Sequence, residues 1–400
     1  MKEVFIVDGV RTAIGSFGGG LADLSSVELG KIVTKALLER AKAPAAEIDE
    51  VLFGSIYQAG LGQGVARQIA IGSGIPAEKT AVTLNMLCGS GMRTVAMAAQ
   101  QILCGDAEMV VAGGTESMTN APYLLKKARG GYKMGHGELT DSMIGDGLWD
   151  IFNNYHMGMT AENLVARYGL TREEQDKFAA ESQNKAEKAL KENRFADEIA
   201  PVMIPQRKGD PIAFARDEYP KAGVTPESLA KLRPAFKKDG SVTAGNASGI
   251  NDGAAAAILM SKEKAKQLGV KPIMRLVNIC GEGCDPKLMG IGPAYAIPKC
   301  LKQAGLKFED IEYWEINEAF AAQWLGVGRL LKKDYGMELS LDKVNHNGSG
   351  IALGHPVGCT GLRIIVSLYY ELERCGLNLG GASLCVGGGP AMASIWTRDI

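Results

Sequence analysis

The pentapeptide GSGMR, from Gly89 to Arg93, returns 270 positions later as CTGLR, from Cys359 to Arg363. Each copy begins a run of residues that predicts an amphipathic helix. An apolar strand ending in glycines follows each helix, as VVAGG at 110–114 and LCVGG at 384–388. We therefore predict a duplicated α/β half, and a cleft between two pseudo-symmetric halves is the natural place for a site.

Strand and helix signals alternate along the first 118 residues and again from about residue 271, which predicts a parallel sheet with right-handed crossovers. Between them, charged helices such as 171–193 and glycine-rich loops indicate an insertion. We expect an N-terminal α/β half at 1–118 that is completed by about 250–270, an inserted loop domain at 119–249, and a C-terminal α/β half at 271–400.

Composition excludes several classes of protein. The 400 residues are 46% hydrophobic and carry a net charge of −1, so no bulk electrostatic attraction to nucleic acid or to an anionic membrane is expected. The eight cysteines are scattered, which favours reduced thiols over a disulfide framework. With no secretory signal and no stretch long enough to cross a bilayer, we expect a cytoplasmic protein.

Cys88 lies in MLCGSGM at a junction between a strand and a helix. A helix N-terminus carries a positive partial charge that favours the thiolate, and Gly89 and Gly91 allow backbone to approach a substrate. A buried structural cysteine would also fit this position. From this stretch alone both interpretations stay open.

Three further stretches carry polar groups at strand ends or helix starts. His355, in NGSGIALGHPVGCTG, precedes the helix of the second copy and can accept a proton near neutral pH. Cys385, in SLCVGGGPAM, ends a buried strand beside three glycines that suit an oxyanion site. Asn317, in WEINEAFAAQ, fits a helix N-cap, and its amide could both end the strand and orient a water or the histidine.

Taken together, these stretches resemble the thiolases, in the branch that uses Cys, His and Cys. The resemblance covers essentially the whole chain and includes the following motifs: VDGVRTAIGSFGG, CGSGM, GGTESM, HMGMTAEN, AGNASGINDGAAA, MGIGP, NEAFAAQ, GHPVGCTG and CVGGG. It implies an α/β fold in which duplicated βαβαβ halves form a five-layered α-β-α-β-α core with an inserted loop domain.

The resemblance also implies roles for single residues. Cys88 would be the nucleophile that becomes acyl-cysteine, His355 its activator, and Cys385 the acid/base thiol for the second substrate. Asn317 would hold a water of an oxyanion pocket. The backbone N–H groups of Cys88 and Gly387 would bind the oxyanion of the acyl-enzyme. No metal and no cofactor are required, because coenzyme A thioesters are the substrates.

A coenzyme A site is implied less directly. Residues assigned to it by resemblance are His156, Met157, Ser248, Met289, Ala319 and Phe320. Without the family, an exposed helix-start histidine, a turn serine and a core methionine would explain His156, Ser248 and Met289.

The segment GYKMGHGELTDSMIGDGL and His156 look like the short-chain acetyl-CoA acetyltransferases, in which that segment forms a loop for tetramer assembly. We therefore expect acetyl-CoA, acetoacetyl-CoA and CoA as the reactants, a homotetramer built as a dimer of dimers, and no nucleic-acid or membrane partner. The motifs MGIGPAYAIP and GHPVGCTG lean instead toward degradative 3-ketoacyl-CoA thiolases of broader chain length, which is the alternative.

The chain departs from the family pattern at His346, Ser349 and Gly350, where an apolar residue, glycine and alanine are more usual. We expect His346 to be a solvated or packed histidine. Rival interpretations are a decarboxylating condensing enzyme, which lacks a second thiol like Cys385, and a CoA-binding protein without catalysis. A metal protein using Cys280 and Cys284 of CGEGC lacks a second ligand pair.

Overall fold

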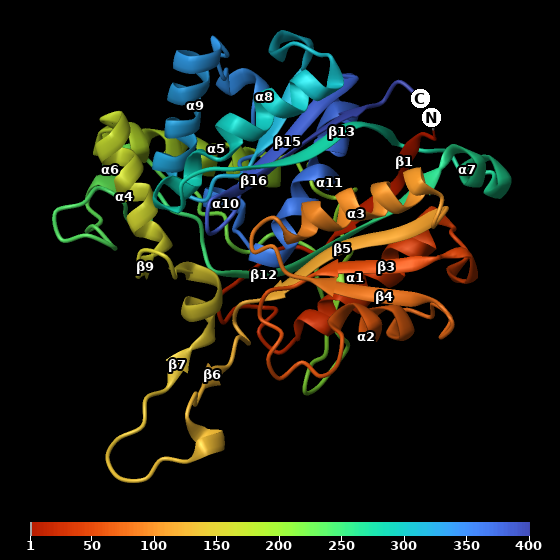
Figure 1. Ribbon diagram of the computed structural model, residues 1–400, viewed down its shortest axis with the longest axis horizontal. Helices are drawn as coiled ribbons and strands as arrows, with labels where there is room; N and C mark the ends of the chain where they lie inside the picture. The colour runs from red at the N-terminus through yellow and green to blue at the C-terminus, as the bar shows by residue number, and fades with distance from the viewer. Residues whose placement is uncertain (1) are drawn as a thin grey trace.

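A computed structural model describes residues 2–400 and places one large mixed sheet through the molecule (Figure 1). Its strand order is β14-β15-β16-β13-β1-β12-β5-β3-β4, with β2 beside β12. The strands are β1 (Val4–Arg11), β2 (Gly15–Ser16), β3 (Glu50–Gly54), β4 (Thr80–Leu84), β5 (Met109–Ser117), β12 (Asn251–Ser261), β13 (Met274–Gly283), β14 (Tyr313–Ile316), β15 (Leu379–Cys385) and β16 (Pro390–Thr397).

The sheet is continuous only through a short contact between β1 and β13, where Phe5 and Ile6 pair with Arg275 and Met274. On either side of it the two halves of the sheet enclose the central helices α3 (Ser90–Cys104) and α11 (Val357–Cys375). Outer helices α1 (Ser26–Ala41) and α2 (Val65–Gly72) cover the N-terminal half, and α8 (Pro293–Ala304) and α9 (Ala321–Tyr335) cover the C-terminal half. The predicted α-β-α-β-α order is therefore confirmed.

Strand β12 lies between two hydrophobic clusters and contributes side chains to both. Ala255, Ala257 and Leu259 pack into the central cluster with α3 and α11, whereas the alternate residues Ala256 and Ile258 pack into the outer cluster with α1 and α2. Both faces of this strand are buried because successive side chains of a strand point to opposite faces. None of the helices within residues 2–400 is both long and apolar enough to cross a membrane.

The expectation of a parallel sheet is only partly correct. Strand β3 is parallel to β4 and β5, and β14 is parallel to β15. Strand β12 is antiparallel to both β1 and β5, and β13 is antiparallel to β16. The sequence NDGAAAAILMS of β12 carries no alternation and little β-propensity, so the prediction that residues of about 250–270 complete the N-terminal half did not delimit a strand there.

Residues between β5 and β12 form small elements that reach across to the C-terminal half. They comprise β6 (Tyr123–Leu124), β7 (Thr140–Asp141), β8 (Trp149–Asp150), β9 (Tyr155–His156), α4 (Met157–Tyr168), α5 (Arg172–Lys191), β10 (Val202–Ile204), β11 (Ile212–Phe214) and α6 (Pro226–Ala230). Helices α4 and α5 contact α9. The β6–β7 segment projects as an arm (Figure 1). The buried Arg11 side chain ties β1 to this region through Glu198 and Asp217, at 2.6 and 2.7 Å.

The first turns of α3 and α11 touch backbone to backbone, at the two residues that the internal repeat makes equivalent. A Cβ atom added to Gly361 would lie 2.5 Å from the backbone N of Met92. A Cβ added to Gly91 would lie 2.7 Å from the backbone N of Leu362. No side chain fits there, so the glycines of the two copies allow the two central helices to meet.

Gly361→Ala should therefore destabilise the fold by about 1–3 kcal/mol, because the added methyl group forces rigid backbone apart. Gly328→Ala is the matched control: it lies in α9, where a Cβ would meet only the Leu339 side chain, at 3.9 Å. That control should be neutral or slightly stabilising. Urea-denaturation midpoints measure both effects, and equal midpoints for Gly361→Ala and the parent protein would contradict the close contact.

Candidate active site

Cys88 lies in a tight turn between β4 and α3. The Asn85 side chain accepts a hydrogen bond from the Leu87 N–H at 2.9 Å, and the Ser90 hydroxyl accepts one from the Met86 N–H at 2.9 Å. Leu87 has φ +46°, an uncommon left-handed conformation for a leucine. The turn therefore holds Cys88 in one orientation at the start of α3.

His355 lies in the equivalent turn of the second copy, directly before α11. Its backbone N–H donates to the Asn251 side chain at 2.9 Å. Its Nδ1 is 2.6 Å from the Thr360 hydroxyl, which itself donates to the Pro356 carbonyl. The hydroxyl proton is thus already used, so Nδ1–H must donate to Thr360, and Nε2 carries the lone pair. Within residues 2–400, Nε2 has no hydrogen-bond partner and is free to accept a proton.

Cys88 and His355 both line one cavity of about 480 Å³. Its walls combine residues of both halves and of the insertion. They include Phe17, Met118, Leu148, Tyr219, Phe236, Ile250 and Val357. Six predicted residues join them, namely His156, Met157, Ser248, Met289, Ala319 and Phe320, together with Gly387. The cavity is mainly apolar, with few polar groups directed into it, as is usual for a small-molecule site.

The cavity holds the thiol and the imidazole in their neutral forms. Burial raises the pKa of the Cys88 thiol to about 11, although N–H groups of Gly387 and of Cys88 itself donate toward the sulfur and lower it. Burial and the nearby Arg363 charge lower the pKa of His355 to about 3. The helix N-terminus was expected to favour the thiolate, but loss of solvation outweighs the helix charge at this position.

Cys385 ends β15 and is almost fully buried behind the cavity wall. It packs in a cluster with Met157, Met289 and Phe320, all of which line the cavity. Burial and the nearby Cys88 raise its pKa well above the ordinary thiol value. Gly388 and Gly389, with φ +81° and +103°, form the turn that follows it.

Cys284 holds that turn, and sequence reasoning missed this role. Its thiol donates to the Gly389 carbonyl at 3.1 Å, and its backbone N–H donates to the same oxygen at 2.9 Å. Cys280 contacts a different group, the Ala296 carbonyl. The two thiols of CGEGC thus contact different parts of the fold, and this explains them without a metal.

Asn317 is not a helix N-cap, because α9 begins at Ala321 and is preceded by Phe320. The Asn317 side chain is fully buried, and neither of its amide atoms has a hydrogen-bond partner among the described residues. A buried amide with both groups unpaired is unusual. Such a group is suited to hold a water or a substrate oxygen.

His156 is the N-cap of α4, and its Nδ1 accepts from the Gly158 N–H at 3.0 Å. Its ring stacks on Phe236 with 4.7 Å between centroids, and burial lowers its pKa. The Ser248 N–H donates to the Ala319 carbonyl at 2.9 Å, which joins two walls of the cavity. His156 is therefore a half-buried wall residue, whereas an exposed helix-start histidine was the family-independent expectation.

Glu116, within GGTESM at the end of β5, was also missed. The carboxylate is fully buried and accepts N–H groups of Ile56, Tyr57 and Gly358 at 3.0, 3.2 and 3.0 Å. Burial raises its pKa to about 7, and its charge acts on the Cys88 thiol. A charged residue that interrupts an apolar strand was the signal available in the sequence. Glu116 joins the first turn of α11 to the loop after β3.

Comparisons with known proteins agree with this geometry. Residues 4–263 match the N-terminal domain of thiolases, and residues 270–398 match the C-terminal domain. An acetyl-CoA acetyltransferase of Pseudomonas aeruginosa is 53% identical, covering 100% of both chains, and one of Chromobacterium violaceum is 54% identical, covering 98% of both.

Two solved structures have the same fold. The acetyl-CoA acetyltransferase of Syntrophomonas wolfei superposes with a TM-score of 0.98 at 53% identity, over 100% of both chains. Human mitochondrial 3-ketoacyl-CoA thiolase superposes with a TM-score of 0.95 at 40% identity, over 100% of this chain and 99% of the other. The chain belongs to the thiolase family.

Proposed function

We propose that the protein is an acyl-CoA C-acyltransferase that joins two molecules of acetyl-CoA reversibly into acetoacetyl-CoA and CoA. One observation carries this proposal: the Cys88 thiol and the free Nε2 of His355 come from equivalent turns of the two copies and open into one apolar cavity. The relatives named acetyl-CoA acetyltransferase, similar over their whole length, support the choice of acyl group.

In the first half-reaction, His355 Nε2 takes the proton of the Cys88 thiol as the sulfur attacks the thioester carbonyl. The carbonyl oxygen becomes an oxyanion within reach of the N–H groups of Cys88 and Gly387, which already point at the sulfur. Expulsion of the CoA thiolate, which regains the proton from His355, leaves an acetyl thioester on Cys88.

In the second half-reaction, the Cys385 thiol gives its proton to His355 Nε2, and the resulting thiolate removes a proton from the α-carbon of a second acetyl-CoA. The resulting carbanion attacks the acetyl carbon on Cys88, a carbon–carbon bond forms, and the Cys88 sulfur leaves as a thiolate that takes the proton from His355. The amide N–H of Asn317 and the protonated Nε2–H of His355 are suited to donate to the enolate oxygen, because neither nitrogen has another partner among the described residues. Every step uses groups of this chain and the two thioesters.

Replacing each thiol should separate the two half-reactions. Cys88→Ser should gain no acetyl group from acetyl-CoA, whereas Cys385→Ala should acquire one acetyl group per chain and fail to condense. Mass spectrometry of the intact proteins and of their peptides measures both outcomes. An unmodified Cys88 peptide in active parent protein that has been mixed with acetyl-CoA would overturn the mechanism.

The apolar walls should restrict the acyl chain. Met157, Met289 and Phe320 line the cavity and are buried, so longer acyl chains placed against them must displace packed side chains. Each two-carbon extension of a 3-ketoacyl-CoA should lower kcat/KM for thiolysis by at least about tenfold. Similar values from four to ten carbons would contradict this and support the broad 3-ketoacyl-CoA thiolase, which the likeness to the human mitochondrial enzyme keeps as the second candidate.

The low pKa of His355 predicts an unusual pH dependence. A pKa of about 3 leaves the imidazole neutral throughout the working range, so acylation should keep its rate from pH 8.5 down to 5.5. An ordinary imidazole of pKa near 6.5 would cost about tenfold at pH 5.5. Single-turnover release of CoA measures the rate.

The lowered pKa of His355 also makes the stability of the folded protein depend on pH. Between pH 6.5 and 3 the unfolded state binds more protons at His355 than the folded state, so stability falls as the pH falls through this range. Rates should therefore be compared only where circular dichroism shows folded protein. A tenfold loss of rate in folded protein at pH 5.5 would show that His355 titrates normally.

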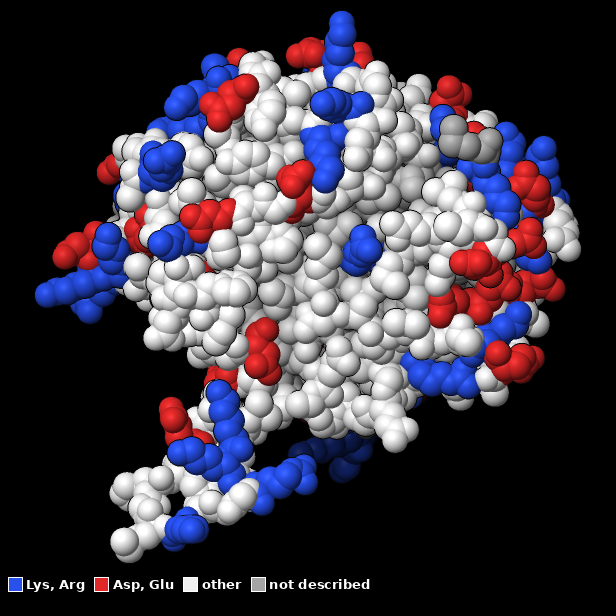
Figure 2. Space-filling model, in the orientation of Figure 1, with Lys and Arg blue, Asp and Glu red and all other residues white. Residues whose placement is uncertain are grey.

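We also propose that the chain assembles as a homotetramer and works in the cytoplasm. All eight cysteines are free, as a reducing compartment allows. The face drawn in Figure 2 has a broad centre with few charges, and β4 leaves one edge of the sheet unpaired within the described chain. The projecting arm exposes Tyr123, Met134 and Leu139, at 64%, 100% and 61%.

Replacing residues 125–139 of the arm by a short Gly-Ser linker should convert the tetramer into dimers, because the arm carries apolar contacts that the rest of one chain does not cover. Light scattering coupled to gel filtration measures the molar mass. A monomeric parent protein, or a tetramer that survives the replacement, would contradict the role of the arm.

A further inference from the structure

His346, Glu371 and Cys375 form a separate cluster at the far end of α11. Glu371 and Cys375 lie one turn apart on that helix, and His346 lies in the loop before α10 (Gly350–Leu353). Glu371 follows the start of α11 by fourteen residues, which places it about 20 Å along the helix from the catalytic turn. The proposed reaction does not use any of the three side chains.

The three side chains point ligand atoms at one another. His346 Nδ1 is 2.7 Å from Glu371 Oε1, and Cys375 Sγ is 3.2 Å from the same oxygen. All three ligand atoms lie within 4.8 Å of each other. Ligands of one tetrahedral zinc ion are separated by roughly 3.3 Å for a nitrogen–oxygen pair and 3.5 Å for a sulfur–oxygen pair. Nδ1 and Sγ, which lie within 4.8 Å, would have to approach to roughly 3.6 Å, so side-chain movements of up to about 1 Å would close the site.

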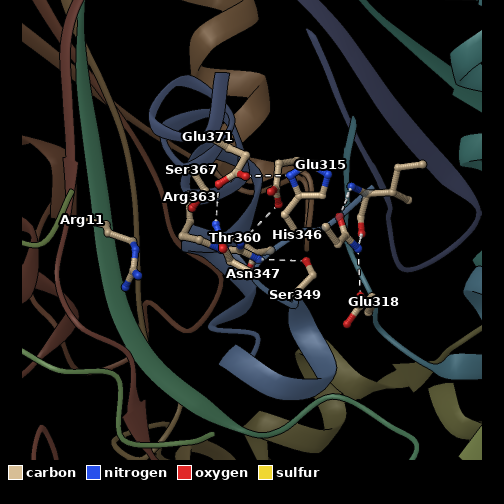
Figure 3. A network of polar contacts seen from close by, with 12 residues as sticks. Arg11, Glu315, Glu318, His346, Asn347, Ser349, Thr360, Arg363, Ser367 and Glu371 are labelled. Atoms are coloured by element: carbon tan, nitrogen blue, oxygen red, sulfur yellow. Dashed lines mark hydrogen bonds and ion pairs between the residues drawn. The ribbon is translucent and has the colours of Figure 1, made fainter. Parts of the chain in front are cut away.

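The surrounding hydrogen bonds leave Nδ1 facing an acceptor. His346 Nε2 is 2.6 Å from the Asp342 carbonyl, which can only accept, so Nε2 carries a proton. In a neutral ring Nδ1 then presents its lone pair to the Glu371 carboxylate. Figure 3 shows this contact, with Asn347 donating to the other carboxylate oxygen at 2.8 Å. A cation between Nδ1 and Oε1 is needed, and it is either a second proton or a metal ion.

The Cys375 thiol beside this contact favours a metal ion over a second proton. An imidazole, a carboxylate and a thiolate are the donors that zinc prefers, and a ring N–H held by a backbone carbonyl is the usual support of a zinc-bound histidine. Asn347 and the guanidinium of Arg374 hold the second oxygen of Glu371. The exposed Cys375 and the partly exposed His346 leave a path from solvent and room for a water as fourth ligand.

We propose that His346, Glu371 and Cys375 bind one zinc ion, or another divalent transition metal, with a water as the fourth ligand. Binding releases the Cys375 thiol proton to solvent, so the thiolate and carboxylate balance the charge of the ion. The ion would join the loop at His346 to α11. This proposal does not rest on the proposed reaction.

Cobalt(II) is the probe, because a cobalt–thiolate bond gives a near-ultraviolet charge-transfer band. Untagged full-length protein, stripped with a chelator, should take up one equivalent of Co²⁺ at this site and show the band. Cys375→Ser should abolish the band, and His346→Gln should weaken binding at least about tenfold. Cys104→Ser, which removes an exposed thiol at the end of α3, is the matched control. It should keep both the charge-transfer band and the affinity of the parent protein for Co²⁺.

Zinc should also raise the melting temperature of the parent protein and of Cys104→Ser, and not that of Cys375→Ser or His346→Gln. Both variants should retain thiolysis activity, which confirms that they fold. If one variant loses this activity, metal uptake by the other variant tests the proposal. Absence of uptake by the parent protein, or equal uptake by parent and both variants, would overturn the proposal. It would leave a His346–Glu371 ion pair, with the proton as the cation.

Discussion

The contact between the first turns of α3 and α11 is the constraint on which the site depends. Gly91 and Gly361 are equivalent in the two copies, and each leaves no room for a Cβ against the backbone of the other helix. Gly114 of β5 is equally close, since its Cβ would lie 2.3 Å from the Gly358 carbonyl. This packing sets the ends of the two helices side by side, and the turns that precede them carry Cys88 and His355.

The electrostatics of the site follow from the burial of Cys88 and His355 at these two turns. A thiol and an imidazole enclosed by apolar walls are both driven toward neutrality, so attack and proton transfer must occur together and no resting ion pair is required. The N–H groups of Cys88 and Gly387 then act mainly on the charge that develops during reaction. Glu116 fixes the start of α11 and, when ionised, further disfavours a thiolate at rest.

Much of this arrangement could be predicted from the sequence because it depends on short local patterns. The repeat of GSGMR as CTGLR predicted both the duplication and the facing turns. Residues of about 250–270 were predicted to complete the N-terminal half, but β12 itself was not delimited because its central AAAA is buried on both faces and carries no period. The neutral state of Cys88 was not predicted either, since desolvation of its thiol depends on cavity walls formed by distant segments, with residues such as Met157 and Phe320. In the sequence, His346 stood out only as a departure from the family pattern. Its neighbours Glu371 and Cys375 belong to a helix whose packing against His346 no local sequence pattern reveals.

The central claim is that the two copies bring a nucleophile, a base and an oxyanion site to one point. A crystal structure of the protein trapped with acetyl-CoA tests it most directly. The acetyl group should be bonded to Cys88 Sγ, with its carbonyl oxygen within hydrogen-bond distance of the N–H groups of both Cys88 and Gly387. An acetyl group on any other residue, or an oxygen directed away from Gly387, would contradict the claim.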